Sequence, residues 1–161
     1  MARRLLAFSA VLLHATLTSG ITVSPDLPEG LYAISLNSTA DPVRIESRAS
    51  HLYRRQANWK AKCGTRGRIN INDFTVAKEN LQKACDGGET YQVQTAVLYT
   101  TGSAVAYFCN YNRPNRCSRA EYEAALLSLV QQCGIGNGGE VTSEPWSKGY
   151  GGDNVGVEIC I

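Results

Sequence analysis

The sequence predicts an α+β fold in which two helices pack on one face of an antiparallel sheet, in the order β-α-β-β-α-β-β, a split βαβ sandwich. Two segments with helical spacing of apolar residues, and β-rich segments around them, carry this prediction. Six cysteines, all after residue 62, indicate that three disulfides stabilise the same region.

The first helix is predicted to start after Asn70 or Asn72, either of which can cap it. Its apolar residues recur at helical spacing: Phe74, Ala77, Leu81, Ala84 and Cys85. Gly87-Gly88 ends it, because glycine readily adopts the left-handed conformation that follows a helix.

The second helix has a clearer start. Ser118-Arg119-Ala120-Glu121 has the form of a capping box, in which the hydroxyl and the carboxylate each accept from an otherwise unpaired backbone N–H. An apolar stripe follows: Tyr122, Ala125, Leu126, Leu129, Val130 and Cys133. Gly134 is the predicted stop.

Strands are predicted between and after the helices. Residues 91–99 and 104–110 are rich in β-formers and are joined by the turn signal Thr100-Thr101-Gly102-Ser103, so we expect a hairpin. Residues 155–160 alternate in a way that is typical of a strand. Residues 66–71 and 139–144 are weaker strand candidates.

The chain is expected to have three parts. Residues 1–20 have the pattern of a secretory signal peptide, with an apolar run that is too short for a comfortable membrane span. Residues 21–55 form an expected pro-segment that ends in the dibasic pair Arg54-Arg55, a site for a Kex-type protease. Residues 56–161 are then the mature domain. The alternatives are a membrane anchor and an uncut dibasic pair in an ordered N-terminal arm.

Two local features mark the expected pro-segment. Residues 31–36 are predicted to form a short extended stretch between turn signals. Asn37 begins the chain's single glycosylation sequon, Asn37-Ser38-Thr39.

Charge argues against nucleic acid as a partner. Of the 16 basic and 14 acidic residues, six and four lie before Gln56, which leaves ten of each in the expected mature domain. Tight nucleic-acid binding usually needs a basic surface, and attraction to anionic membranes needs one too. We therefore predict no nucleic-acid partner and no stable membrane insertion.

The cysteines allow a first prediction of pairing. If the chain reverses direction at each element, Cys133 and Cys160 fall near one end of the sheet, so we expect a Cys133–Cys160 disulfide. The remaining pairs would form among Cys63, Cys85, Cys109 and Cys117. No metal site is predicted, because no two cysteines have C-x-x-C spacing.

Histidine is missing from the expected mature domain. Both histidines, His14 and His51, precede Gln56, which excludes Ser-His-Asp and Cys-His catalytic sets there. Carboxylate-based hydrolysis passes this test. However, nothing in the spacing of Glu140, Glu144 and Asp153 indicates a working pair, and surface solvation is the expected role of all three.

Several short sequence motifs resemble those of a known protein family. They are Val105-Ala106-Tyr107-Phe108-Cys109-Asn110-Tyr111, Cys117, Cys133-Gly134, Trp146-Ser147-Lys148-Gly149-Tyr150-Gly151, Val157-Glu158-Ile159-Cys160 and, in the pro-segment, Pro28–Ile34. This pattern resembles a family of small, secreted, cysteine-rich fungal proteins treated as candidate effectors. The order of elements is more distantly similar to the virally encoded killer toxins of smut fungi, which act without catalysis. No toxin functional residue matches a position in this chain.

The leading hypothesis is a non-enzymatic, extracellular effector or toxin-like protein without cofactor. As a monomer, it would bind a host or competitor protein or a cell-surface glycan, for example in the host apoplast. The candidate contact residues lie in two loops and are Tyr111, Arg113, Arg116, Arg119, Trp146, Lys148 and Tyr150. Ordinary solvated loops, with Trp146 closing the end of the core, are the alternative.

Two other functions remain open at this stage. A chitin-binding protein would use Trp59, Trp146 and Tyr150 as an aromatic platform. A small hydrolase would use carboxylates among Glu140, Glu144 and Asp153.

Overall fold

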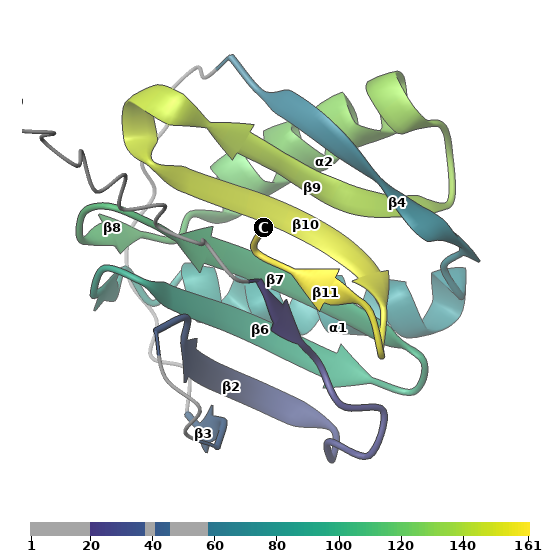
Figure 1. Cartoon of the computed structure of the whole chain (residues 1–161), viewed down its shortest axis with the longest axis horizontal. Helices are drawn as coiled ribbons and strands as arrows, with labels where there is room; N and C mark the ends of the chain where they lie inside the picture. The colour runs from purple at the N-terminus through teal and green to yellow at the C-terminus, as the bar shows by residue number, and fades with distance from the viewer. Residues whose placement is uncertain (1–19, 38–40, 46–57) are drawn as a thin grey trace, which may run out of the picture.

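A seven-stranded antiparallel sheet forms the centre of the structure, a computed structural model that describes residues 20–37, 41–45 and 58–161. The strands lie in the order β3-β2-β6-β7-β10-β9-β4 (Figure 1). Their bounds are β2 (Gly30–Ser35), β3 (Val43–Arg44), β4 (Lys60–Arg68), β6 (Thr95–Thr101), β7 (Ala104–Asn110), β9 (Asn137–Ser143) and β10 (Lys148–Asn154). Two helices, α1 (Ile71–Cys85) and α2 (Arg119–Cys133), lie on one face, which confirms the predicted α+β class.

The opposite face carries a ribbon of two short strands, β1 (Ile21–Thr22) and β11 (Glu158–Ile159), which lie in front of the sheet in Figure 1. The strand predicted at 155–160 is therefore shorter than expected and pairs with β1, outside the central sheet. A second ribbon joins β5 (Thr90–Tyr91) to β8 (Asn115–Arg116), and η1 (Glu144–Trp146) is a single 3-10 turn.

Both helices begin where the sequence predicts, but only α1 is capped as expected. The Asn70 Oδ1 atom accepts from the backbone N–H groups of Asn72 and Asp73 at 3.0 and 3.4 Å. The capping box predicted for α2 is wrong: the Ser118 side chain makes no capping hydrogen bond, and Glu121 is buried. The Glu121 carboxylate pairs instead with the buried ammonium of Lys148.

The predicted hairpin is confirmed as β6 and β7, which pair from Thr95↔Asn110 to Thr101↔Ala104. Gly102 has a φ of +53° in the turn, a conformation that glycine adopts without steric cost. The turn is fastened to α1, because the Asp73 Oδ2 atom accepts from both the N–H and the hydroxyl of Ser103 at 2.8 Å. These two hydrogen bonds lower the pKa of Asp73.

The sequence reading missed β10 entirely and treated residues 144–153 as a Gly-rich loop. In the structure β10 is a central strand, paired on one side with β7 and on the other with β9. Glycine is disfavoured in strands because ordering it costs more backbone entropy and it has no side chain to pack. Gly149, Gly151 and Gly152 therefore made residues 148–154 an unexpected strand. The weaker candidates at 66–71 and 139–144 correspond to β4 and β9, both displaced toward the N-terminus.

Part of the expected pro-segment belongs to this sheet. The extended stretch predicted at 31–36 is confirmed as β2, which pairs with β6 over six positions from Gly30↔Thr100 to Ser35↔Thr95. Asn37 follows β2 and is exposed. The signal segment up to residue 19 and the Arg54-Arg55 pair lie outside the described residues, so cleavage at either place stays a prediction.

The sheet separates two apolar cores. On the helical face, Leu81 and Tyr122 pack against alternate sheet residues such as Phe108 and Tyr150. On the other face, Tyr107 belongs to a cluster that also includes the following residues: Val23, Tyr32, Ile34, Leu98 and Ile159. Because side chains alternate along a strand, β7 supplies both cores.

Three disulfides connect the described cysteines: Cys63–Cys133, Cys85–Cys117 and Cys109–Cys160. The predicted Cys133–Cys160 pair is wrong. Cys133 ends α2 and packs on the helical core, whereas Cys109 and Cys160 lie in the core on the other face. The prediction considered only the end of the sheet at which each cysteine lies. The pairing also depends on the face of the sheet that each cysteine occupies.

Candidate functional site

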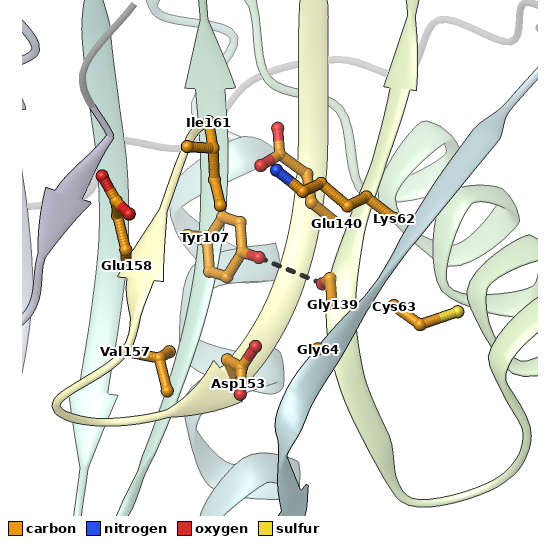
Figure 2. A pocket seen from close by; sticks show the side chains of 10 residues that line it. All are labelled: Lys62, Cys63, Gly64, Tyr107, Gly139, Glu140, Asp153, Val157, Glu158 and Ile161. Atoms are coloured by element: carbon orange, nitrogen blue, oxygen red, sulfur yellow. Dashed lines mark hydrogen bonds between the residues drawn. The ribbon is translucent and has the colours of Figure 1, made fainter.

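A hollow of about 260 Å³ lies on the sheet face that the helices leave uncovered. Figure 2 shows Tyr107, Glu140 and Asp153 on the sheet, with Lys62 from β4 and the C-terminal residues from Val157 to Ile161 around them. The hollow thus lies between the edge of the sheet and the β11 segment. It is the best candidate for a functional site among the residues that the structure describes.

Glycines in β10 make room for the hollow. A Cβ atom at Gly149 would collide with the Glu140 carboxylate, and a Cβ atom at Gly151 would collide with the ring of Tyr107. Without these Cβ atoms, both side chains lie flat across β10. The Tyr107 hydroxyl reaches the carbonyl oxygen of Gly139 on the far side, at 3.0 Å.

Glu140 is the most unusual residue of this site. Glu140 is 4 % exposed, and its Oε1 atom accepts a hydrogen bond from the Tyr111 hydroxyl. Its Oε2 atom is buried and has no hydrogen-bond partner of ordinary geometry in the described part of the chain. Burial raises the pKa of Glu140 from 4.5 to about 7. Four groups oppose this rise: the Tyr111 hydroxyl, the backbone N–H groups of Ile161 and Cys160, and the Lys62 charge. At neutral pH this carboxyl group therefore exchanges readily between its charged and neutral forms.

Asp153 brings a second carboxylate to the same face. Gly151 pairs with Glu140, so Asp153, two residues further along β10, stands diagonally across from Glu140. Asp153 is 5 % exposed, and its Oδ1 atom accepts from the N–H of Asn154 at 2.9 Å. Glycines at 64 and 138 leave space for its carboxylate, because a Cβ at either position would crowd it.

The remaining charges lie at the rim. Lys62 extends from β4 toward the Glu140 carboxylate, as Figure 2 shows, and Glu158 lines the opposite side. Both residues are exposed. Among the described side chains that line the hollow, Glu140, Asp153 and Glu158 are acidic and Lys62 is basic. Tyr107 does not add to this charge, because burial raises the pKa of its hydroxyl well above 10.

The structure changes the role expected for two of the three carboxylates, Glu140, Glu144 and Asp153. Surface solvation is the right role for Glu144, whose side chain is 73 % exposed, but it is wrong for Glu140 and Asp153. The available signal was a charged residue flanked by glycine and β-formers, Gly139-Glu140-Val141, within a predicted strand. Its importance depends on β10, which the sequence reading did not place.

Tyr111 is the predicted contact residue that the structure brings to the hollow, through its bond to Glu140. The three predicted arginines serve other contacts. Arg113 donates to the backbone carbonyls of Pro145 and Trp146, Arg116 donates to the Thr90 hydroxyl at 3.2 Å, and Arg119 pairs with Asp86 at 3.1 Å. Whether these arginines also contact a partner stays a prediction.

Lys148 and Tyr150, predicted as loop contacts, are buried in β10. Lys148 forms an ion pair with Glu121, and the Tyr150 hydroxyl donates to the same carboxylate at 3.0 Å. The Tyr150 hydroxyl also accepts from the N–H of Ser118 at 3.1 Å. This buried network joins the sheet to the start of α2 and is not accessible to a large partner.

The aromatic residues named for chitin binding do not form a flat platform. Trp59 meets Trp146 and Tyr150 edge to face, at 84° and 73° with ring centroids 5.7 and 5.6 Å apart. The Lys148 ammonium lies 5.1 Å from the centre of the Trp146 ring, in cation–π range. Trp146 is half-buried and packs on Trp59, which itself packs against the helical core.

No cluster of three or more histidine, cysteine, aspartate or glutamate side chains suited to a metal ion occurs within residues 20–37, 41–45 and 58–161. Over the same ranges, neither helix has the length and apolar character needed to cross a bilayer. Comparison with protein-family models, with curated proteins and with solved structures finds no match.

Proposed function

We propose that this chain is a secreted, non-enzymatic binding protein of the effector type, which holds a cationic side chain of its target in the hollow over Glu140. The observation that carries the proposal is the buried Glu140 Oε2 atom, which makes no hydrogen bond of ordinary geometry among the described residues, although the backbone N–H groups of Cys160 and Ile161 lie near the carboxylate. A buried acceptor without a partner costs free energy, and a ligand donor removes that cost.

The charge and size of the hollow favour the guanidinium or ammonium group of an arginine or lysine. Among the described side chains that line the hollow, Glu140 and Glu158 outnumber Lys62, so a cation gains favourable electrostatic energy there. A volume of about 260 Å³ lies below the range typical of drug-sized ligands and suits a single side chain. An exposed arginine or lysine on a host or competitor protein is therefore the partner proposed.

Export supports this reading from a second direction. The signal-like residues 1–20 and the three disulfides agree with an oxidising, extracellular setting. The described residues contain no histidine, and the fold holds no Ser-His-Asp arrangement for that reason. Action by contact with a target is therefore the leading proposal.

The test titrates the secreted protein with ethylguanidinium, butylammonium and acetate, and follows backbone amide shifts by NMR. We expect the two cations to shift residues around Glu140 and acetate to shift none. Glu140→Gln removes the charge with little change in shape and abolishes the effect. The matched control, Glu144→Gln, alters an exposed carboxylate outside the hollow and keeps it. Equal binding by Glu140→Gln and the unaltered protein would reject the proposal.

A biological readout uses the same variants. The unaltered protein and Glu144→Gln are expected to retain the same protein from tissue of a suspected host, and Glu140→Gln is expected to lose it. Retention that does not depend on Glu140 would place the contact surface elsewhere.

Carboxylate-based hydrolysis is the second candidate, favoured by one observation. Glu140 has its pKa raised to about 7, and a second buried carboxylate, Asp153, shares its face. Glycosidases work with a pair of carboxyl groups, one of which has a raised pKa. Release of reducing ends from chitin or peptidoglycan, lost in both Glu140→Gln and Asp153→Asn, would favour this function. No release by the unaltered protein would remove it.

A further inference from the structure

The segment before the dibasic pair is built into the fold. Residues 20–45 supply β1, β2 and β3. Figure 1 shows β2 beside β6, β3 on the outer side of β2, and β1 on β11. A pro-segment that ends at Arg55 is expected to be discarded after cleavage. Its contacts indicate a different fate.

Apolar side chains of the segment enter both cores. Leu31 packs in the core on the helical face, and Tyr32 and Ile34 pack in the core on the other face. Val23 is 1 % exposed and exchanges backbone hydrogen bonds with the C-terminal part, since its N–H donates to Val157 and its carbonyl accepts from Gly156 at 2.8 Å. Removing the segment would expose these cores and the whole edge of β6.

No covalent bond other than the main chain holds the segment in place. It contains no cysteine, and the three disulfides lie within residues 63–160. Its only link to β4 is the peptide chain that contains Arg54-Arg55. After a cut at this pair, only non-covalent contacts would hold the segment. They include strand pairing, apolar packing and the hydrogen bonds that the hydroxyls of Thr101 and Tyr99 donate to the Glu29 carboxylate at 2.8 and 3.2 Å.

We infer that cleavage after Arg55 yields a two-chain protein, in which the N-terminal fragment stays bound as a non-covalent subunit. A Kex-type endoprotease adds one water across the Arg55–Gln56 peptide bond, leaving a carboxylate on Arg55 and an amino group on Gln56. The surface that receives the fragment is the edge of β6 together with β11. The fragment is therefore a permanent partner of residues 56–161.

The retained fragment also supports the candidate site. β1 pairs with β11 through Ile21↔Ile159 and Thr22↔Glu158, and Glu158 lines the hollow. Among the described strands, β11 pairs with β1 alone, so loss of β1 would leave β11 unpaired. This inference does not depend on the proposed ligand, because it concerns chain association alone.

The test cleaves the full secreted chain, made in a host without the dibasic protease, with a Kex-type endoprotease in vitro. Non-reducing denaturing mass spectrometry is expected to show two fragments, one ending at Arg55 and one starting at Gln56. Native mass spectrometry of the same sample is expected to show a single species that carries both. A native species of residues 56–161 alone would overturn the inference. So would resistance of the Arg55–Gln56 bond while a dibasic control peptide is cut.

Two matched variants of the full chain locate the holding contacts. Ile34→Asp places a charge in a core position that is 9 % exposed, and we expect it to release the fragment after cleavage. Val43→Asp makes the same change in β3 at a position that is 62 % exposed, and we expect the fragment to stay. Release from both variants, or from neither, would contradict the packing described. If Ile34→Asp does not fold, native mass spectrometry of the unaltered protein still decides the question.

Discussion

The hydroxyl of Tyr107 donates to the carbonyl oxygen of Gly139 across β10, at 3.0 Å. The two residues lie on strands that do not pair with each other, and Gly151 lies between them under the tyrosine ring. This bridge closes the floor of the hollow. It depends on a residue without a Cβ at position 151.

Gly151→Ala tests this bridge. The added Cβ would collide with the Tyr107 ring and with the Gly139 carbonyl, so we expect the free energy of unfolding to fall by about 1–3 kcal/mol, as in other overpacked sites. Urea denaturation measures the change. In a Tyr107→Val background the cost falls, because only the backbone collision remains. A cost that is the same in both backgrounds would show that the ring does not occupy this space.

The pH dependence of stability tests Glu140. Its pKa is about 7 in the folded protein and 4.5 ordinarily, so between these values the folded state binds more protons than the unfolded state. Stability therefore falls as pH rises through this window, by roughly 3 kcal/mol at most. We expect Glu140→Gln to lose this fall and to be more stable than the unaltered protein at pH 8, as measured by urea denaturation.

The control for that experiment is Glu144→Gln. Glu144 is exposed, with a surface ion pair to Lys60, and such pairs contribute about 0–1 kcal/mol. Its curve is expected to follow that of the unaltered protein. If stability instead rises between pH 5 and 7 in all three proteins, burial does not control the ionisation of Glu140.

The disulfides make a prediction about both pairing and binding. Non-reducing peptide mapping is expected to recover Cys63–Cys133, Cys85–Cys117 and Cys109–Cys160. Replacing either of the last two pairs by serines is expected to cost about 2–4 kcal/mol of unfolding free energy. Only loss of Cys109–Cys160 is expected to weaken ethylguanidinium binding, because Cys160 holds the C-terminal wall of the hollow next to Ile161.

The variant without Cys85–Cys117 is the matched control, because that bridge joins α1 to the start of α2 away from the hollow. Equal loss of binding in both variants would mean that the bridges act only through overall stability. Recovery of a Cys133–Cys160 peptide would contradict the structure.

The buried ion pair between Glu121 and Lys148 is also open to mutation. Both side chains are 6 % exposed, so Glu121→Gln leaves a buried ammonium without its counter-charge, and we expect a loss of about 3–5 kcal/mol. Glu121→Leu combined with Lys148→Met removes both charges and is expected to cost less than the single change. Thermal unfolding of the single and double variants measures the difference. A double variant less stable than the single one would contradict this account.

Local patterns predicted the helices and the hairpin well. The Asn70 cap and the apolar spacing placed the helices, because capping and amphipathic periodicity depend on near neighbours in sequence. Ser118 marks the start of α2 without capping it. β10 was not predicted, because its glycines have no local preference for a strand. The candidate site was not predicted either, because it depends on β10. Glu140 and Asp153 acquire their roles only when β10 brings them to one face.

The sequence alone determined the α+β class, the positions of both helices and of the central hairpin, and the formation of three disulfides, since these follow from periodicity, turn residues and cysteine count. Only the tertiary structure decided which cysteines pair, where the buried carboxylates lie, and that residues 20–45 belong to the central sheet and the ribbon on its open face. These features depend on which face of the sheet a side chain occupies. Sheet faces are set by pairing between strands that are distant in sequence, and that information is not local.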